Sequence, residues 1–168
     1  MNPENSLSKP YLIGVLALTI IFPALSVFIN WLIVRSLPIS VETMGKWFIF
    51  WAVGLRLFIA GLRQVFNPAF TAKTIFHLSD TGSYVIVKEL GFANICFGLI
   101  GMLSLLIPQW CIVSAFGSGI FYGIAGINHL VQKNTGANEK VALLSDLLIF
   151  FLLLIHFLML QFNCSHFS

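Results

Sequence analysis

The sequence predicts an all-α integral membrane bundle of about five transmembrane helices. Of its 168 residues, 58% are hydrophobic and only 9% are charged. A small globular domain could not keep so much apolar area from water, because its surface must be largely polar. The apolar runs also approach the roughly 20 residues that cross about 30 Å of hydrocarbon. Backbone groups in lipid must be bonded within the segment, and the runs lack the alternation of strands, so each run is predicted to be a helix.

The predicted spans form one transmembrane domain, residues 1–168. The first run is longer than the apolar region of a signal peptide, so we expect it to be retained as a helix. The connection Pro108-Gln109 is so short that the third and fourth spans are expected to form an antiparallel hairpin. In chain order the predicted spans cover residues 11–34, 46–66, 84–107, 110–131 and 141–162.

The segment 67–83 lies between the second and third predicted spans. It is too short and too polar to cross a membrane. Apolar residues such as Phe70 and Phe76 could anchor it at the membrane surface. The sequence therefore allows a surface or re-entrant segment as well as a plain loop. A bundle of four spans plus a re-entrant segment is the alternative to five spans.

Basic residues predict the orientation of the chain, because cytoplasmic loops of membrane proteins are enriched in Lys and Arg. With five spans, the side that holds the N-terminus carries six basic residues and the opposite side two. We therefore predict a cytoplasmic N-terminus and a C-terminus on the opposite side of the membrane. The first group is Lys9, Arg63, Lys73, Lys88, Lys133 and Lys140, and the second is Arg35 and Lys46.

Small residues follow one face of the third and of the fourth span, at about 100° per residue. Small residues let helix backbones approach closely in lipid, where apolar side chains provide no drive for association. Because the two spans are predicted neighbours, we expect these faces to pack against each other. The third span contributes Gly91, Gly98 and Gly101, together with Asn94; the fourth contributes Ala115, Gly119, Gly123 and Gly126.

Polar residues inside the spans are the candidates for a functional site. Arg56 lies near mid-span, where a charge on lipid costs between about 2.5 and more than 10 kcal/mol, so it should point into protein. Arg63 and Glu89 lie near the cytoplasmic end and are expected to pair. His129 and Asp146 lie at a similar depth. For Glu89, Arg63 and Asp146 a purely structural ion pair explains the sequence equally well.

The remaining polar groups favour structural roles. Asn94 is expected to form an interhelical hydrogen bond, and His156 to be an ordinary core histidine. The three cysteines form no CxxC pair, and the four histidines lie on different segments. No phosphate-binding glycine loop or nucleophile elbow occurs. We therefore predict no metal and no cofactor, and whether the protein is an enzyme stays open, with a non-enzyme favoured.

Several residues resemble those of a known family. They are Arg63-Gln64 followed by Pro68, the run E-x-G-x-A-N-x-x-x-G-x-x-G that begins at Glu89, His129 before a polar loop, and Asp146. From about Leu55 to Phe162 the chain resembles an uncharacterised family of small bacterial and archaeal multi-pass inner-membrane proteins, loosely similar to DoxX-like proteins. It departs from that pattern at residues 77–87, where a compact Ser-Pro turn is expected. The resemblance implies a helical bundle in the bacterial inner (plasma) membrane, with the C-terminus then periplasmic, and transfers no catalytic residue.

Two classes of function fit these observations. The favoured class is a non-enzymatic accessory subunit or a small-solute or ion permease, in which Arg56 and the cytoplasmic polar cluster bind an anion, a lipid headgroup or a partner helix. The alternative is a membrane enzyme or redox accessory that acts on a lipid-soluble substrate such as a quinone, with Glu89, His129 and Asp146 handling protons. Expected partners are membrane lipid and either another membrane subunit or a second copy of the chain, but no nucleic acid.

Overall fold

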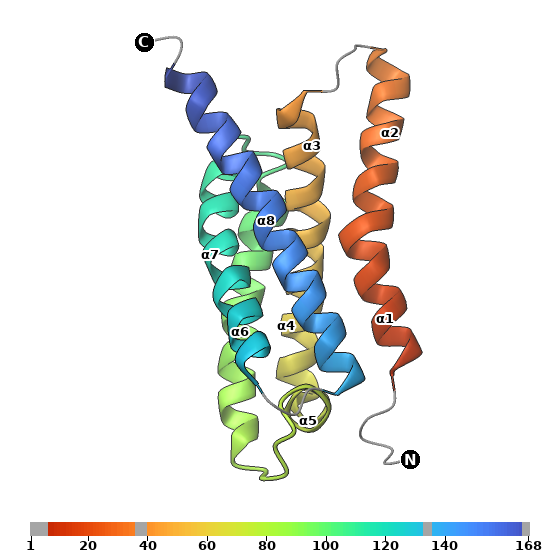
Figure 1. Ribbon diagram of the computed structural model, residues 1–168, viewed down its shortest axis with the longest axis vertical. Helices are drawn as coiled ribbons and strands as arrows, with labels where there is room; N and C mark the ends of the chain where they lie inside the picture. The colour runs from red at the N-terminus through yellow and green to blue at the C-terminus, as the bar shows by residue number, and fades with distance from the viewer. Residues whose placement is uncertain (1–6, 36–39, 133–135, 166–168) are drawn as a thin grey trace.

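The computed structural model describes residues 7–35, 40–132 and 136–165, and the side chains as far as residue 161. Five helices in it are long and apolar enough to cross a membrane, and the described residues contain no strand. The predicted all-α bundle of about five spans is therefore confirmed. The helices are Lys9–Val34, Val41–Phe66, Ser83–Leu103, Trp110–Val131 and Ala137–Gln161. The two ends of the chain lie at opposite ends of the bundle (Figure 1).

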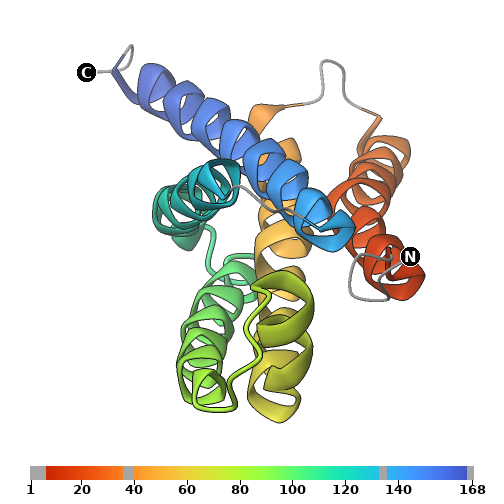
Figure 2. The ribbon, with the colours of Figure 1, turned by 60° about the horizontal axis from the view of Figure 1, so that its bottom comes forward.

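The first span consists of α1 (Lys9–Leu16), the π-helical turn η2 (Ala17–Ile21) and α2 (Phe22–Val34). Pro23 explains the interruption, because it has no N–H to donate to the α-helical ladder. At this point the N–H of Phe22 bonds the carbonyl of Ala17, five residues back. The span lies to one side of the other helices (Figure 2).

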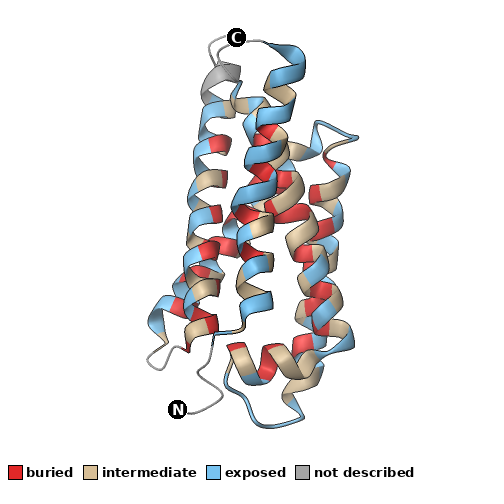
Figure 3. Cartoon of the chain, turned by 90° about the vertical axis from the view of Figure 1, so that its right-hand side faces the viewer, coloured by how far each residue is buried: buried red, intermediate tan, exposed pale blue. Residues whose placement is uncertain are grey.

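The second span is likewise interrupted by a π-helical stretch, in α3 (Val41–Phe48), η3 (Ile49–Leu55) and α4 (Arg56–Phe66). The wider turn lies at the centre of the core, where Ile49, Val53 and Leu57 are buried. Tyr122 of the fourth span donates its hydroxyl hydrogen to the carbonyl of Ala52 at 2.9 Å. The second span therefore contacts all four other spans, and Figure 3 shows buried residues on the inward sides of the helices.

The segment after the second span contains a short helix. It is formed by α5 (Pro68–Phe70) and η4 (Thr71–Ile75), which lie across one end of the bundle (Figure 1). Thr71, Ala72 and Ile75 are buried against the spans. The sequence left this segment open between a surface or re-entrant element and a plain loop. The buried face shows that its first half is a helix that covers the end of the bundle.

The last three spans are α6 (Ser83–Leu103), α7 (Trp110–Val131) and α8 (Ala137–Ser165). The predicted third span extends too far, because α6 ends at Leu103 and residues 104–109 form the turn to α7. Figure 2 shows α6 beside α4 and α7 beside α8. The turn thus joins two helices that each pack along a different partner.

The glycine faces follow this pairing, so the prediction that they meet each other is wrong. A Cβ at Gly98 would lie 2.5 Å from the Phe58 nitrogen and 2.8 Å from the Gly54 oxygen, which places α6 against the second span. A Cβ at Gly123 would lie 2.8 Å from Cδ2 of Phe150 on α8. Each small-residue face therefore admits a helix, as expected in lipid. The face of α6 meets the second span, and the face of α7 meets α8.

The other glycines of the two faces make the same contacts. On α6, a Cβ at Gly91 would lie 2.9 Å from the Gly61 oxygen, and one at Gly101 2.7 Å from the Gly54 nitrogen. On α7, Ala115 is buried in the core, and a Cβ at Gly119 would lie 3.6 Å from Cβ of Leu153. A Cβ at Gly126 would lie 2.6 Å from Cδ2 of Leu147.

Candidate functional site

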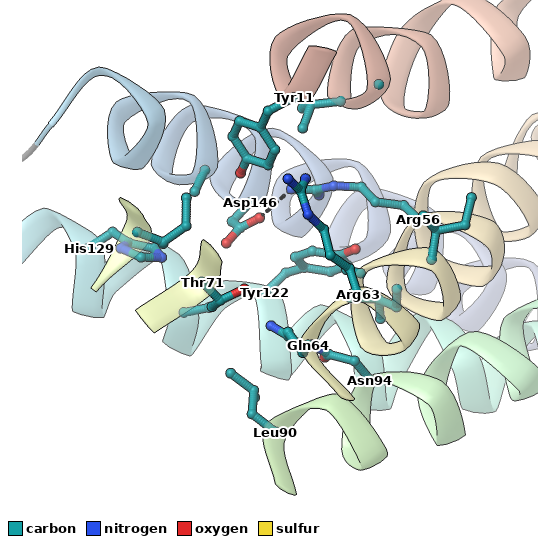
Figure 4. Close-up of a pocket in the computed structure, with 18 of the residues that line it drawn as sticks. Tyr11, Arg56, Arg63, Gln64, Thr71, Leu90, Asn94, Tyr122, His129 and Asp146 are labelled. Atoms are coloured by element: carbon teal, nitrogen blue, oxygen red, sulfur yellow. Dashed lines mark hydrogen bonds and ion pairs between the residues drawn. The ribbon is translucent and has the colours of Figure 1, made fainter. Parts of the chain in front are cut away.

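A cavity of about 560 Å³ lies at the end of the bundle that α5 and η4 cover. Its wall includes residues from α1, α4, α6, α7 and α8 (Figure 4). Most of the wall is apolar, with Leu57, Leu90 and Phe121 among its residues. Both the size and the mixture of apolar walls with few polar groups are typical of small-molecule binding sites.

A buried ion pair lies in this cavity. Arg56, the first residue of α4, donates from Nη2 to Oδ1 of Asp146 on α8 at 2.8 Å and to Oγ of Ser145 at 2.7 Å. The Arg56 and Asp146 side chains are each only 11% exposed. The guanidinium also lies 5.2 Å from the ring centroid of Tyr122. The mid-span charge is thus compensated by protein, which removes much of the cost of placing it within a membrane span.

Two buried polar atoms on the cavity wall have no hydrogen-bond partner among the described residues. They are Nη1 of Arg56 and Oδ1 of Asn94. The other amide atom of Asn94, Nδ2, donates to Oε1 of the buried Gln64 at 2.7 Å. Buried polar groups normally have partners, and a donor and an acceptor left over in one cavity point to a polar ligand.

Arg63 adds a second positive charge to the wall. Its guanidinium lies 3.5 Å from the ring centroid of Phe70 on α5, and the residue is exposed. The predicted pair with Glu89 is wrong, because Glu89 is exposed on α6 and makes no ion pair within the described part of the chain. The physical reason is the helix face: Gly91 faces α4, and a residue two positions away on a helix points elsewhere.

A second cluster of titratable groups joins the surface to the cavity. Glu139, at the start of α8, is fully buried. Its Oε1 lies 3.2 Å from Nδ1 of His129, and its Oε2 lies 3.3 Å from Nε2 of His77. The His129 side chain is 8% exposed and lines the cavity, whereas that of His77 is 29% exposed. We call His77, Glu139 and His129 the histidine–glutamate cluster.

Backbone geometry brings His77 to this cluster. His77 has a φ of 54°, in the left-handed region that residues other than glycine seldom adopt. It directly follows the short helix of α5 and η4, whose last turn is closed by the bond from the Phe76 nitrogen to the Thr71 oxygen. The Phe76 ring also stacks on His129, with ring centroids 6.4 Å apart. The left-handed turn thus directs His77 towards Glu139 while Phe76 covers His129.

Sequence reasoning placed some of these groups and missed others. Arg56, Arg63, Asn94, His129 and Asp146 all line the one cavity, and Glu89 does not. Two of the missed residues, His77 and Glu139, lie outside the predicted spans, where no helical periodicity connects them to the site. The other missed residues lie within predicted spans and line the cavity: Tyr11, Gln64 and Tyr122. A buried Glu139 in particular has no signal in sequence, because it lies next to a polar loop.

The second cavity is separate from this site. It measures about 190 Å³, lies between α3 and α8, and has a wall with few polar atoms. His156 lines it, with Nδ1 buried and unpartnered, so the expectation of an ordinary, satisfied core histidine is wrong. The ring lies directly on Gly45 of α3, where there is no Cβ to exclude it.

Neither cluster provides a metal centre. Within the described part of the chain, no group of three or more His, Cys, Asp or Glu residues could hold a metal ion. The lining of the first cavity offers ionic recognition and hydrogen bonding: two guanidinium groups for an anion, amide groups for orientation, and apolar walls for a hydrocarbon body.

Comparison with known proteins assigns the chain to a family without assigning an activity. No curated protein and no solved structure matches it. A family model described as a family of unknown function, DUF6790, matches residues 11–166. The predicted resemblance to an uncharacterised family thus holds, while the bacterial or archaeal origin and the DoxX-like relation stay predictions. The chain belongs to the DUF6790 family of unknown function.

Proposed function

We propose that this protein is a non-enzymatic membrane permease that binds a small amphiphilic anion in the cavity beside Arg56. The observation that carries the proposal is the unpartnered, buried Nη1 of Arg56 on the wall of that cavity. An anionic headgroup would accept a hydrogen bond from this atom, and charge-assisted bonds to Arg are among the stronger ones in proteins.

The charges around the cavity favour a singly charged anion. The Arg56 and Asp146 charges compensate each other, which leaves Arg63 as an additional positive charge on the wall. Leu57, Leu90 and Phe121 would contact an apolar body. A molecule with one carboxylate or sulfonate and a short hydrocarbon chain satisfies both parts of the wall.

The basic residues support a cytoplasmic position for this cavity. The end of the bundle with α5 also holds the start of α1 and of α8 (Figure 1), and hence Lys9, Lys73 and Lys140. Lys133, which contributes to the same prediction, lies outside the described residues. We propose that the cavity faces the cytoplasm of a bacterial cell and that the protein resides in the plasma membrane.

Binding is tested with three probes that share a six-carbon chain: hexanesulfonate, hexanol and hexyltrimethylammonium. Calorimetry on detergent-purified protein should detect hexanesulfonate binding and no comparable binding of the other two. Arg63→Gln should weaken hexanesulfonate binding about tenfold or more. Lys88→Gln also removes one positive charge from an exposed residue, but outside the cavity, and should not weaken binding. Equal binding of all three probes would contradict the proposal.

Transport is tested separately in proteoliposomes. Hexanesulfonate keeps its charge and crosses a bare bilayer slowly, so uptake should require the protein. A variant with Arg56→Gln and Asp146→Asn removes both buried charges together and should abolish uptake. Binding without uptake would favour an accessory role over a permease. A quinone absorbance in the ultraviolet spectrum of the purified protein would favour the redox alternative.

A further inference from the structure

The histidine–glutamate cluster places a fully buried carboxyl between two imidazole rings. Oε1 of Glu139 lies 3.2 Å from Nδ1 of His129, and Oε2 lies 3.3 Å from Nε2 of His77. A buried carboxylate is compensated when a neighbouring group carries a positive charge. A proton shared among these three side chains would supply that charge.

The cluster connects bulk water to the cavity. His77 is 29% exposed and can exchange protons with water, whereas His129 is 8% exposed and lines the cavity. Glu139 contacts both rings, one through each oxygen. Histidine is the side chain whose charge changes most readily near neutral pH. The order of exposure thus places a protonatable group at the surface, a buried carboxyl next, and a protonatable group beside the ligand.

We propose that the histidine–glutamate cluster couples anion binding to the uptake of one proton. This inference rests on the proposed function, because it concerns the ligand of the same cavity. In the free protein one extra proton is shared and the cluster is neutral. When the anion enters, a second proton from water is bound, so that both imidazoles are protonated and Glu139 is ionised. The His129 imidazolium then faces the anion, and the cluster carries a charge of about +1.

Other charged groups near the cluster do not link the protein surface to the cavity as the cluster does. Asp146 on α8 is an acid that lines the cavity, but Arg56 already pairs with it. Lys73 on η4 and Lys140 on α8 are exposed, and neither lines the cavity. Arg63 lies over Phe70. Within the described residues, only the cluster joins exposed and cavity-lining titratable groups through direct contacts.

Calorimetry with hexanesulfonate counts the protons. This probe does not protonate, so any proton taken up on binding goes to the protein. Titrations in two amine buffers of different ionisation enthalpy should give an uptake near one proton per anion. By linkage, the affinity should fall as pH rises, by up to about tenfold per pH unit.

His77→Gln is the decisive variant, because His77 is partly exposed and its replacement keeps a polar side chain. With one imidazole left, the free state is a His129 imidazolium paired with the Glu139 carboxylate. A second proton could then bind only to that carboxylate and would remove the buried imidazolium's counter-charge, which opposes its uptake. Binding should persist, proton uptake should fall to near zero, and the affinity should become nearly independent of pH. His156→Gln removes a histidine of the second cavity and should leave the uptake near one.

Three results would overturn the coupling, and they separate it from the proposed function. Hexanesulfonate binding without proton uptake in the wild-type protein would contradict the coupling alone. Undiminished uptake in His77→Gln would place the proton on another group, such as Asp146, and would also contradict it. Absence of binding at every pH would overturn the proposed function, and the coupling with it.

Discussion

Arg56 and Asp146, which lie 90 positions apart in the chain, form an ion pair of 2.8 Å between the second and fifth spans. Each side chain is nearly nine-tenths buried. The pair stabilises the contact of α4 with α8 only while both charges are present, since a single buried charge would be left without solvation. The pair also leaves Nη1 of Arg56 on the cavity wall without a hydrogen-bond partner among the described residues.

Removal of one member of this pair should be much more harmful than removal of both. Arg56→Gln leaves the Asp146 carboxylate buried and should lower the free energy of unfolding by about 3–5 kcal/mol. The combined change of Arg56→Gln and Asp146→Asn should recover most of that loss. Thermal unfolding in detergent measures both, and strictly additive losses would show that the two residues do not depend on each other.

Gly98→Ala should destabilise the contact between α6 and the second span. The new Cβ would lie 2.5 Å from the Phe58 nitrogen, and a backbone atom cannot move aside as a side-chain tip can. Gly117→Ala is the matched control, since its Cβ would lie 3.4 Å from Phe97 Cε1 and alanine favours helix by about 0.5–1 kcal/mol. Equal melting temperatures of the two variants would refute the close approach at Gly98.

Tyr122→Phe should remove a single interhelical hydrogen bond from the core. The hydroxyl donates to the Ala52 carbonyl at 2.9 Å, and the ring would stay in place beside Arg56. We expect a loss of about 0.5–1.5 kcal/mol in the free energy of unfolding. Tyr84→Phe, whose hydroxyl has no hydrogen bond within the described chain, should change stability little; a comparable loss in both variants would count against the bond.

Glu89→Gln should be nearly neutral for stability. Glu89 is exposed and forms no ion pair with Arg63 among the described residues, so neutralising it leaves no buried charge behind. In a double-mutant cycle with Arg63→Gln, the effects on unfolding should add to within about 0.5 kcal/mol. A coupling energy well above that value would mean that the two residues pair in the membrane.

Reporter fusions should test the orientation. A reporter after the C-terminus is expected to be periplasmic, and one inserted in the loop between α7 and α8 cytoplasmic. The basic residues favour this orientation, and the five helices place these two sites at opposite ends of the bundle. The same location for both reporters would be incompatible with five crossings.

The helices themselves follow from local sequence, and the site follows only partly. Runs of apolar residues must be helical in lipid, so their number and approximate bounds could be predicted without a structure. The position of Arg56 near the middle of a span was also enough to predict that its side chain faces protein. Its partner could not be predicted, because Asp146 belongs to a distant span and helical periodicity describes the face of one helix without naming the helix that it meets.

Two further errors have the same origin. The Glu89 and Arg63 pair was inferred from equal depth, and depth leaves the rotation of each helix undetermined. The short connection Pro108-Gln109 predicts that the two glycine faces meet, yet the second span lies against Gly98 and α8 lies against Gly123. Short turns constrain only the ends of two helices, and side-chain packing decides the partner along the rest of their length.

By itself the sequence determined that this protein is a helical membrane bundle, and that Arg56 and the small residues of α6 and α7 face protein. Only the tertiary structure decided that Arg56 pairs with Asp146, that α5 and η4 cover a cavity, and that His77 and His129 contact Glu139. The physical reason is the range over which each interaction acts. Hydrocarbon acts on each segment separately, whereas an ion pair or a cavity exists only between segments whose relative rotation and spacing result from packing of the whole bundle.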